Sequence, residues 1–303
     1  MASPSSPSSA SVAVQFVLTG LVWGSSFLLI AIALTGLSPA QVAGGRLLFG
    51  ALALGAIVLL KRERMPRAPR TWAHLCVLAA SFCVVPYLLF AWAQQHVPSG
   101  LASIFNATTP IMTAILAWAV FRVERLRRGQ LAGIGVGIAG VVVIIAPGTA
   151  AAVAESTIAQ IALLGATACY GFSLAYMRRF LGDSGLSGTV FAFGYIAPAA
   201  AFMLLLSPLI LAEPMDLTPA VVLSVIALGV LGTGVAYVWN QNTLRAWGPT
   251  RASTVTYITP VVGVALGIVV LGERLTWNEP VGAVIVFAGI LLVQERLRFR
   301  VPA

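Results

Sequence analysis

Ten long apolar segments account for most of this chain, and they leave it few possible folds. They cover residues 12–34, 39–60, 72–95, 102–121, 129–146, 158–178, 185–211, 219–243, 252–272 and 279–296. A helix that crosses a bilayer needs about 20 apolar residues and satisfies its own backbone hydrogen bonds. Only 9% of the residues are charged, against about 25% in a soluble domain. We therefore predict an all-α integral membrane protein with ten transmembrane helices.

The sequence also repeats itself after about 150 residues. The clearest matches pair Tyr87 with Tyr237, Thr109-Pro110 with Thr259-Pro260, and Glu124-Arg125-Leu126 with Glu273-Arg274-Leu275. Each copy holds five predicted helices, and an odd number makes the second copy enter the membrane from the opposite side. We therefore expect two inverted five-helix repeats, an arrangement typical of transporters.

These repeats predict the domain boundaries. We expect a flexible N-terminal tail at residues 1–11, a first repeat at 12–146, a second repeat at 158–296 and a cytoplasmic tail at 297–303. The connections are short, so consecutive helices should be antiparallel neighbours.

Basic residues predict how the chain is oriented. Of the 18 Lys and Arg residues, all but Arg46 and Arg274 lie in alternate connections or at the C-terminus. Cytoplasmic connections carry such an excess of positive charge. We predict a multi-pass protein of the bacterial cytoplasmic (inner) membrane with both termini cytoplasmic. The net charge of +9 is then an anchor to anionic lipid and predicts no nucleic-acid partner.

Arg46 is the one ionisable residue well inside an apolar segment. All nine acids fall in or beside connections, so no carboxylate is available at mid-membrane to attract a cationic substrate. An intramembrane charge indicates a functional site by default. Two interpretations stay open: Arg46 binds a ligand anion, or it ties helix carbonyls together.

Aromatic and amide side chains gather at the middle depth of several predicted helices. Aromatic rings with a polar tip suit a cavity that is apolar but needs a few hydrogen bonds. We expect the wall of a central cavity to include Trp23, Tyr87, Tyr170, Tyr237, Trp239 and Tyr257, with Asn106, Asn240 and Arg46 as polar anchors. Any one of these rings could instead be a packing residue.

Two prolines are candidate hinges. Pro110 and Pro260 sit well inside the predicted fourth and ninth helices, where each removes a backbone donor. Membrane helices tolerate this where hydroxyl groups or water satisfy the freed carbonyl, and threonines lie beside both prolines. The alternatives are a static kink and a hinge, and the symmetric placement favours the hinge.

Several motifs together resemble the EamA family of the drug/metabolite transporter superfamily. They are Trp23-Gly24-Ser25-Ser26-Phe27, Leu37-Ser38-Pro39, Ala102-Ser103 through Thr109-Pro110, Glu124-Arg125-Leu126, and their second copies up to Leu271-Gly272-Glu273-Arg274-Leu275. The resemblance covers about residues 12–295 and implies two inverted five-helix repeats that export small metabolites. Two departures are Tyr170-Gly171-Phe172 in the sixth helix and the lack of a counterpart of Arg46 in the seventh. The acid-free, aromatic-rich interior is most similar to YddG-type amino-acid exporters.

The expected function is therefore secondary export of neutral or zwitterionic metabolites, in particular amino acids with aromatic or large apolar side chains. A nucleotide-sugar or triose-phosphate antiporter would need several cations in the cavity. An integral membrane enzyme would need clustered acids, His or Ser, and the sequence offers only a loose serine motif at Gly185-Leu186-Ser187-Gly188. A channel-like subunit is a further alternative. The expected partners are a small-molecule substrate and the lipid bilayer; we expect no metal or other cofactor, and a monomer is compatible with the sequence.

Overall fold

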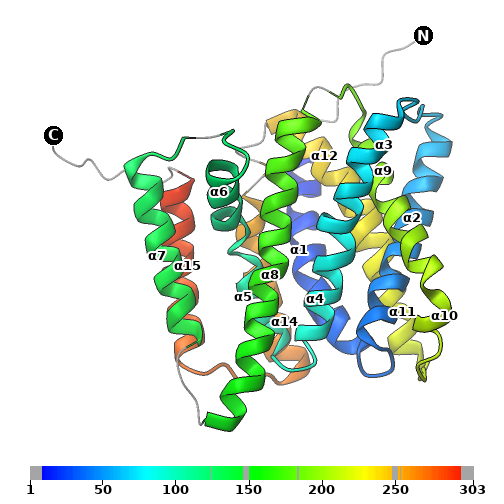
Figure 1. Cartoon of the computed structure of the whole chain (residues 1–303). Coiled ribbons are helices and arrows are strands. Elements are labelled where there is room, and N and C mark those ends of the chain that lie inside the picture. The colour runs from blue at the N-terminus through cyan, green and yellow to red at the C-terminus, as the bar shows by residue number, and fades with distance from the viewer. Residues whose placement is uncertain are drawn as a thin grey trace.

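The chain folds into a bundle of long apolar helices (Figure 1). The computed structural model describes residues 9–123, 125–145, 150–182, 184–247, 252 and 254–294, and in these residues there is no strand. The helices are α1 (Ser9–Ala33), α2 (Pro39–Leu60), α3 (Pro69–Leu78), α4 (Val85–Ala93), α5 (Ser99–Asn106), α6 (Thr109–Ala119), α7 (Arg128–Ile145), α8 (Ala150–Phe180), α9 (Gly188–Leu205), α10 (Ser207–Ile210), α11 (Pro219–Ala227), α12 (Ala236–Trp247), α14 (Val255–Leu271) and α15 (Asn278–Val293), with π-helical segments η1 (Ala79–Val84) and η2 (Leu228–Val235).

Eight helical stretches in the described residues are long and apolar enough to cross a membrane. The remaining two apolar helices, α14 and α15, have 17 and 16 residues, which gives each about 25 Å at 1.5 Å per residue. This is shorter than a bilayer core of about 30 Å. The all-helical, multi-pass membrane fold is thus confirmed, while ten full-length spans and their inverted arrangement stay predictions.

The helices lie close to the predicted segments, with some differences at their ends. The second helix covers Pro39–Leu60 as expected, but α8 begins at Ala150, eight residues before the predicted start at 158. The expected flexible tail at 1–11 falls mostly outside the described residues, which begin in α1. The connections after α2, α6 and α8 lie at one end of the bundle, the upper end of Figure 1.

The fourth predicted helix is not continuous. A turn at Ala107 and Thr108 separates α5 from α6, and Pro110 is the second residue of α6. The prediction that Pro110 lies well inside a helix is therefore wrong: a proline ring is readily accommodated in the first turn, where no intrahelical donor is needed, whereas further in it kinks or breaks the helix. The Asn106 carbonyl accepts a hydrogen bond from the Thr109 hydroxyl at 2.8 Å. Pro260, in contrast, does lie inside a helix, the buried part of α14.

The third and eighth predicted helices each contain a π-helical segment that the sequence did not predict. The segment η1 joins α3 to α4, and η2 joins α11 to α12. The segment η2 packs closely against α2, because a Cβ added to Gly229 would lie 2.9 Å from the Arg46 carbonyl oxygen. π-helical turns are rare and frequently occur at functional sites.

The two halves of the chain pack against each other along several helix pairs. In Figure 1, α7 and α15 lie side by side at one edge of the bundle. Amide side chains tie this pair at both ends, because Gln130 donates to the Val293 carbonyl at 3.1 Å and Asn278 donates to the Ile144 carbonyl at 2.7 Å. The Gln41 side chain of α2 similarly donates to the carbonyls of Ile210 and Glu213, each at 3.0 Å.

A carboxylate joins the two halves where α5 begins. Glu273, in the connection after α14, accepts hydrogen bonds from the backbone amides of Ser99 at 2.6 Å and Gly100 at 2.9 Å. These amides belong to the first turn of α5, where N–H groups have no partner inside the helix. The negative charge also faces the positive end of the helix dipole. In the second copy of the Glu-Arg-Leu motif, Glu273 thus caps α5; Glu124 of the first copy lies outside the described residues.

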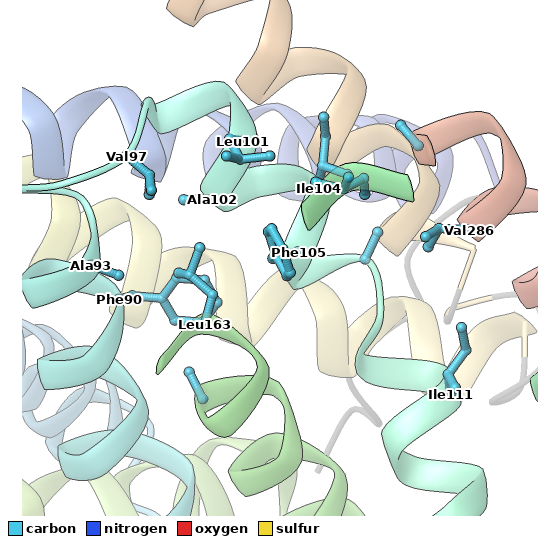
Figure 2. Packing of buried hydrophobic residues seen from close by; sticks show 14 of the residues in the cluster. Phe90, Ala93, Val97, Leu101, Ala102, Ile104, Phe105, Ile111, Leu163 and Val286 are labelled. Atoms are coloured by element: carbon cyan, nitrogen blue, oxygen red, sulfur yellow. The ribbon is translucent and has the colours of Figure 1, made fainter. Parts of the chain in front are cut away.

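The largest buried cluster surrounds the broken fourth helix. Figure 2 shows Phe90 and Leu163 below Phe105, and Leu101 and Ile104 of α5 above it. These residues come from α4, α8 and α5. The cluster therefore holds α5 in place from several sides.

Candidate functional site

Arg46 of α2 is held by residues from two other elements, η2 and α4. Its Nε donates a hydrogen bond to the Thr233 hydroxyl at 3.0 Å, and its guanidinium carbon lies 3.9 Å from the centroid of the Tyr87 ring. Thr233 belongs to η2 and donates in turn to the Leu228 carbonyl at 3.2 Å. The π-helical segment thus supplies the acceptor that orients the arginine.

The guanidinium is only partly used by the protein. It carries five N–H donors, and one of them bonds Thr233. Among the described residues, no hydrogen bond reaches its terminal nitrogens, and the Arg46 side chain keeps some accessible surface. The Tyr87 hydroxyl is buried and lies near the Thr233 and Tyr237 hydroxyls, without reaching good hydrogen-bond geometry to any group in this part of the chain. Unused donors deep in an apolar bundle are costly unless a ligand or water satisfies them.

Trp23 of α1 contacts both η2 and α12. Its indole N–H donates to the Gly232 carbonyl at 3.1 Å, and its ring meets Tyr237 edge-on with centroids 5.8 Å apart. Trp23 and Tyr237 are both partly exposed. The first helix is in this way connected to the start of α12.

A continuous series of ring contacts extends from this pair toward α8. Tyr237 contacts Tyr195 at 6.2 Å between centroids, Tyr195 contacts Phe82 at 5.7 Å, and Phe82 contacts Tyr170 at 5.3 Å. Tyr170 stacks on Phe90 at 6.0 Å. The guanidinium of Arg46 lies close enough to Tyr170 and Tyr237 to interact with them electrostatically. We call Trp23, Tyr237, Tyr195, Phe82, Tyr170 and Phe90 the aromatic series.

The structure therefore brings together five of the expected site residues, which are Trp23, Arg46, Tyr87, Tyr170 and Tyr237. The other four have different surroundings. Tyr257 hydrogen-bonds to Gln294 and contacts Phe287 of α15. Asn106, Trp239 and Asn240 are partly exposed, and no contact described in the structure joins them to Arg46.

Four members of this region were missed by the sequence analysis. Tyr195, Phe82 and Phe90 lie inside predicted apolar segments and are aromatic, like the rings that were chosen. Thr233 gave no such signal, because its role depends on the π-helical geometry of η2.

The serine motif at residues 185–188 has a structural role. Ser187 is the N-cap of α9, and its hydroxyl accepts a hydrogen bond from the Val190 amide at 3.2 Å. The same hydroxyl donates to the Glu63 carboxylate. In the described residues, no group of three or more His, Cys, Asp or Glu side chains could hold a metal ion.

A comparison with protein families matches the description "EamA-like transporter family" twice, at residues 10–146 and 157–294. The chain belongs to this family. The EamA assignment makes it a transporter, and the two matches correspond to the two copies of the sequence repeat.

Relatives of this EamA chain cover almost its whole length. A protein named "Probable terminal-alkyne amino-acid exporter" from Streptantibioticus cattleyicolor is 28% identical over 92% of each chain. A "Probable amino-acid metabolite efflux pump" from Salmonella typhimurium is 29% identical, covering 91% of this chain and 92% of that protein. The "Uncharacterized inner membrane transporter YedA" from Escherichia coli is 27% identical, covering 92% and 89%. One solved crystal structure, at 18% identity, superposes with a TM-score of 0.66 over 95% of this chain and 99% of that one, and it shows the shared fold alone.

Proposed function

We propose that this EamA-family transporter exports small metabolites, in particular amino acids with aromatic or large apolar side chains. One observation carries the proposal: the Arg46 guanidinium, whose terminal N–H groups have no partner among the described residues, lies over the Tyr87 ring and interacts electrostatically with Tyr170 and Tyr237 of the aromatic series. The guanidinium is suited to a carboxylate, and the rings are suited to an apolar or aromatic side chain. The amino-acid relatives named above add support.

The cavity we propose is lined by Trp23, Tyr87, Tyr170 and Tyr237, with Arg46 as the anchor for the carboxylate. Asn106, Trp239, Asn240 and Tyr257 would join it when the helices rearrange during transport. The proposed motion is a rocking of the two inverted repeats, with bending at the turn before Pro110 and at Pro260. The broken fourth helix supports this, because a short turn can absorb a change of backbone angles.

The proposed location is the bacterial cytoplasmic membrane with both termini inside. Arg-rich connections at one end of the bundle support this orientation, and one relative is named an inner membrane transporter. A single site arginine gives little support to a phosphate-carrying antiporter, which would need several cations.

Counterflow in proteoliposomes tests the proposed function. Vesicles that contain the purified protein and are loaded with one unlabelled amino acid should accumulate the labelled form, and a panel should rank phenylalanine, tyrosine and leucine above alanine and lysine. Vesicles without protein and vesicles with Arg46→Gln are the controls. Accumulation of no amino acid by correctly folded protein would refute the proposal.

A further inference from the structure

We propose that the site recognises the carboxylate of its substrate and not the ammonium, so that aromatic or large apolar monocarboxylates without an amino group bind at least as tightly as the matching amino acids. This inference rests on the proposed function, since it concerns the same site. It adds a substrate class with a net charge of −1 to the zwitterions named above.

The hydrogen bonds of Arg46 are the first support. Nε is engaged by Thr233, and one face of the guanidinium is covered by the Tyr87 ring. The terminal N–H groups lie in the guanidinium plane and have no protein partner among the described residues. A planar fork of unused donors fits the two oxygens of a carboxylate. The buried hydroxyl of Tyr87, which lies near those of Thr233 and Tyr237, is a further polar group on the neighbouring side chain.

The distribution of charge is the second support. No acid lies near Arg46 along its own helix: Glu63 comes after the end of α2, and the helix from Arg46 to Leu60 is about 21 Å long at 1.5 Å per residue. Glu155 in α8 is 15 residues from Tyr170, about 22 Å along the axis. Glu213, Asp216, Glu273 and Glu279 follow or precede helices at their ends or lie in the first turn. Among the described residues, the surroundings of Arg46 thus carry one positive charge and no carboxylate.

Electrostatics then favour a ligand with a negative charge and no positive one. An unpaired cation in a low-dielectric interior is costly, and an opposite charge relieves that cost. A zwitterion supplies a carboxylate but also buries an ammonium. No carboxylate among the described residues of this site can pair with that ammonium. The ring faces can attract an ammonium, but such contacts are weak compared with a buried ion pair. The amino group is therefore expected to add nothing to affinity or to reduce it.

Three ligands that share a phenyl ring and a two-carbon spacer test the proposal directly. They are phenylalanine, 3-phenylpropionate, which lacks the ammonium, and 2-phenylethylamine, which lacks the carboxylate. Calorimetric titration of the purified full-length protein in detergent at pH 7.5 gives each affinity and avoids leakage of the free acid across membranes. We expect 3-phenylpropionate to bind at least as tightly as phenylalanine, and 2-phenylethylamine to bind at least tenfold more weakly.

Variants identify the responsible group. Arg46→Gln should weaken both acids at least tenfold, and Arg46→Lys, which keeps the charge but loses the fork, should weaken them less. Tyr87→Phe should weaken them moderately, while the matched control Tyr176→Phe should not, because the Tyr176 hydroxyl is engaged by His74. The wild-type ranking alone decides the case if a variant fails to fold.

The outcomes separate this inference from the proposed function. If phenylalanine binds tenfold more tightly than 3-phenylpropionate, the site also binds the ammonium. The inference is then overturned, and amino-acid export stands. Equal binding of the amine and the acids also overturns it. If neither acid binds, the inference and the proposed function both fail. If 3-phenylpropionate binds and phenylalanine does not, the inference holds and the amino-acid assignment fails.

Discussion

The contact between α7 and α15 predicts a strong effect of a single methyl group at Gly289. A Cβ added there would lie 2.5 Å from the Gly137 backbone nitrogen and 2.7 Å from the Gly133 carbonyl oxygen. Ordinary contacts between heavy atoms are about 3.5–4.0 Å. Both neighbours are backbone atoms, which no rotamer change can move. Gly289→Ala must therefore push the two helices apart by about 1 Å.

The size of the effect follows from two opposing terms. Overpacking of a close interface costs about 1–3 kcal/mol, and the rigid backbone contact places Gly289→Ala at the upper end. Alanine in place of glycine returns up to about 1 kcal/mol of helix propensity. We expect a net destabilisation of about 2 kcal/mol. Gly135→Ala is the matched control, because its Cβ would meet no atom within 4 Å, and it should stabilise α7 by up to about 1 kcal/mol.

The measurement is reversible unfolding of the purified protein in mixed detergent micelles, followed by tryptophan fluorescence. The two alanine variants should differ by about 3 kcal/mol in the free energy of unfolding, since the propensity gain is common to both. Equal stability of Gly289→Ala and Gly135→Ala would show that the helices are not in backbone contact, and the packing argument would be refuted.

Three further predictions concern the site, the Glu273 contact and the topology. Trp23→Ala and Tyr170→Ala should impair transport of bulky substrates with near-normal expression and thermal stability; if both variants fail to fold while the residual protein transports normally, these residues are packing residues. Glu273→Gln should lower stability by about 1.5–3 kcal/mol, because one of two charge-assisted bonds to α5 is lost, while the exposed Glu213→Gln should be neutral; equal melting temperatures would argue against the contact. In a cysteine-free background, a single cysteine at Arg64 should be labelled only from the cytoplasm and one at Glu213 only from outside, and the reverse pattern would overturn the orientation.

Hydropathy was sufficient to find the helices, because a membrane segment is defined by its own length and composition. It could not find the turn at Ala107 and Thr108 or the π-helical segments. Pro110 has no backbone N–H to donate. A helix can accommodate this loss by a kink or by a turn, and the sequence does not decide between the two. A π-helical turn such as η2 depends on a partner, here the close approach of α2 at Gly229.

The site was predictable in its residue types but only partly in its membership. Arg46 and Trp23 were found because a charge and an indole are conspicuous in an apolar segment. Their partners, the Thr233 hydroxyl and the Gly232 carbonyl, lie about 190 and 210 residues away in the chain. Such pairs arise from the packing of helices. For the same reason the sequence could not tell that Tyr257 turns toward α15.

The hydrogen bond from Arg46 to Thr233 has a consequence for how the protein is made. The two residues are 187 positions apart, which corresponds to about 9–37 s of synthesis at 5–20 residues per second. During this interval α2 has left the ribosome, and η2 does not yet exist. A central arginine costs a helix about 2.5–3.5 kcal/mol on insertion, and the apolar residues around Arg46 must offset this cost unaided. The residues of α2 must therefore be apolar enough for the helix to insert from the translocon, in addition to forming the finished site. A polar substitution in this helix that the folded protein would tolerate can still prevent its entry into the bilayer.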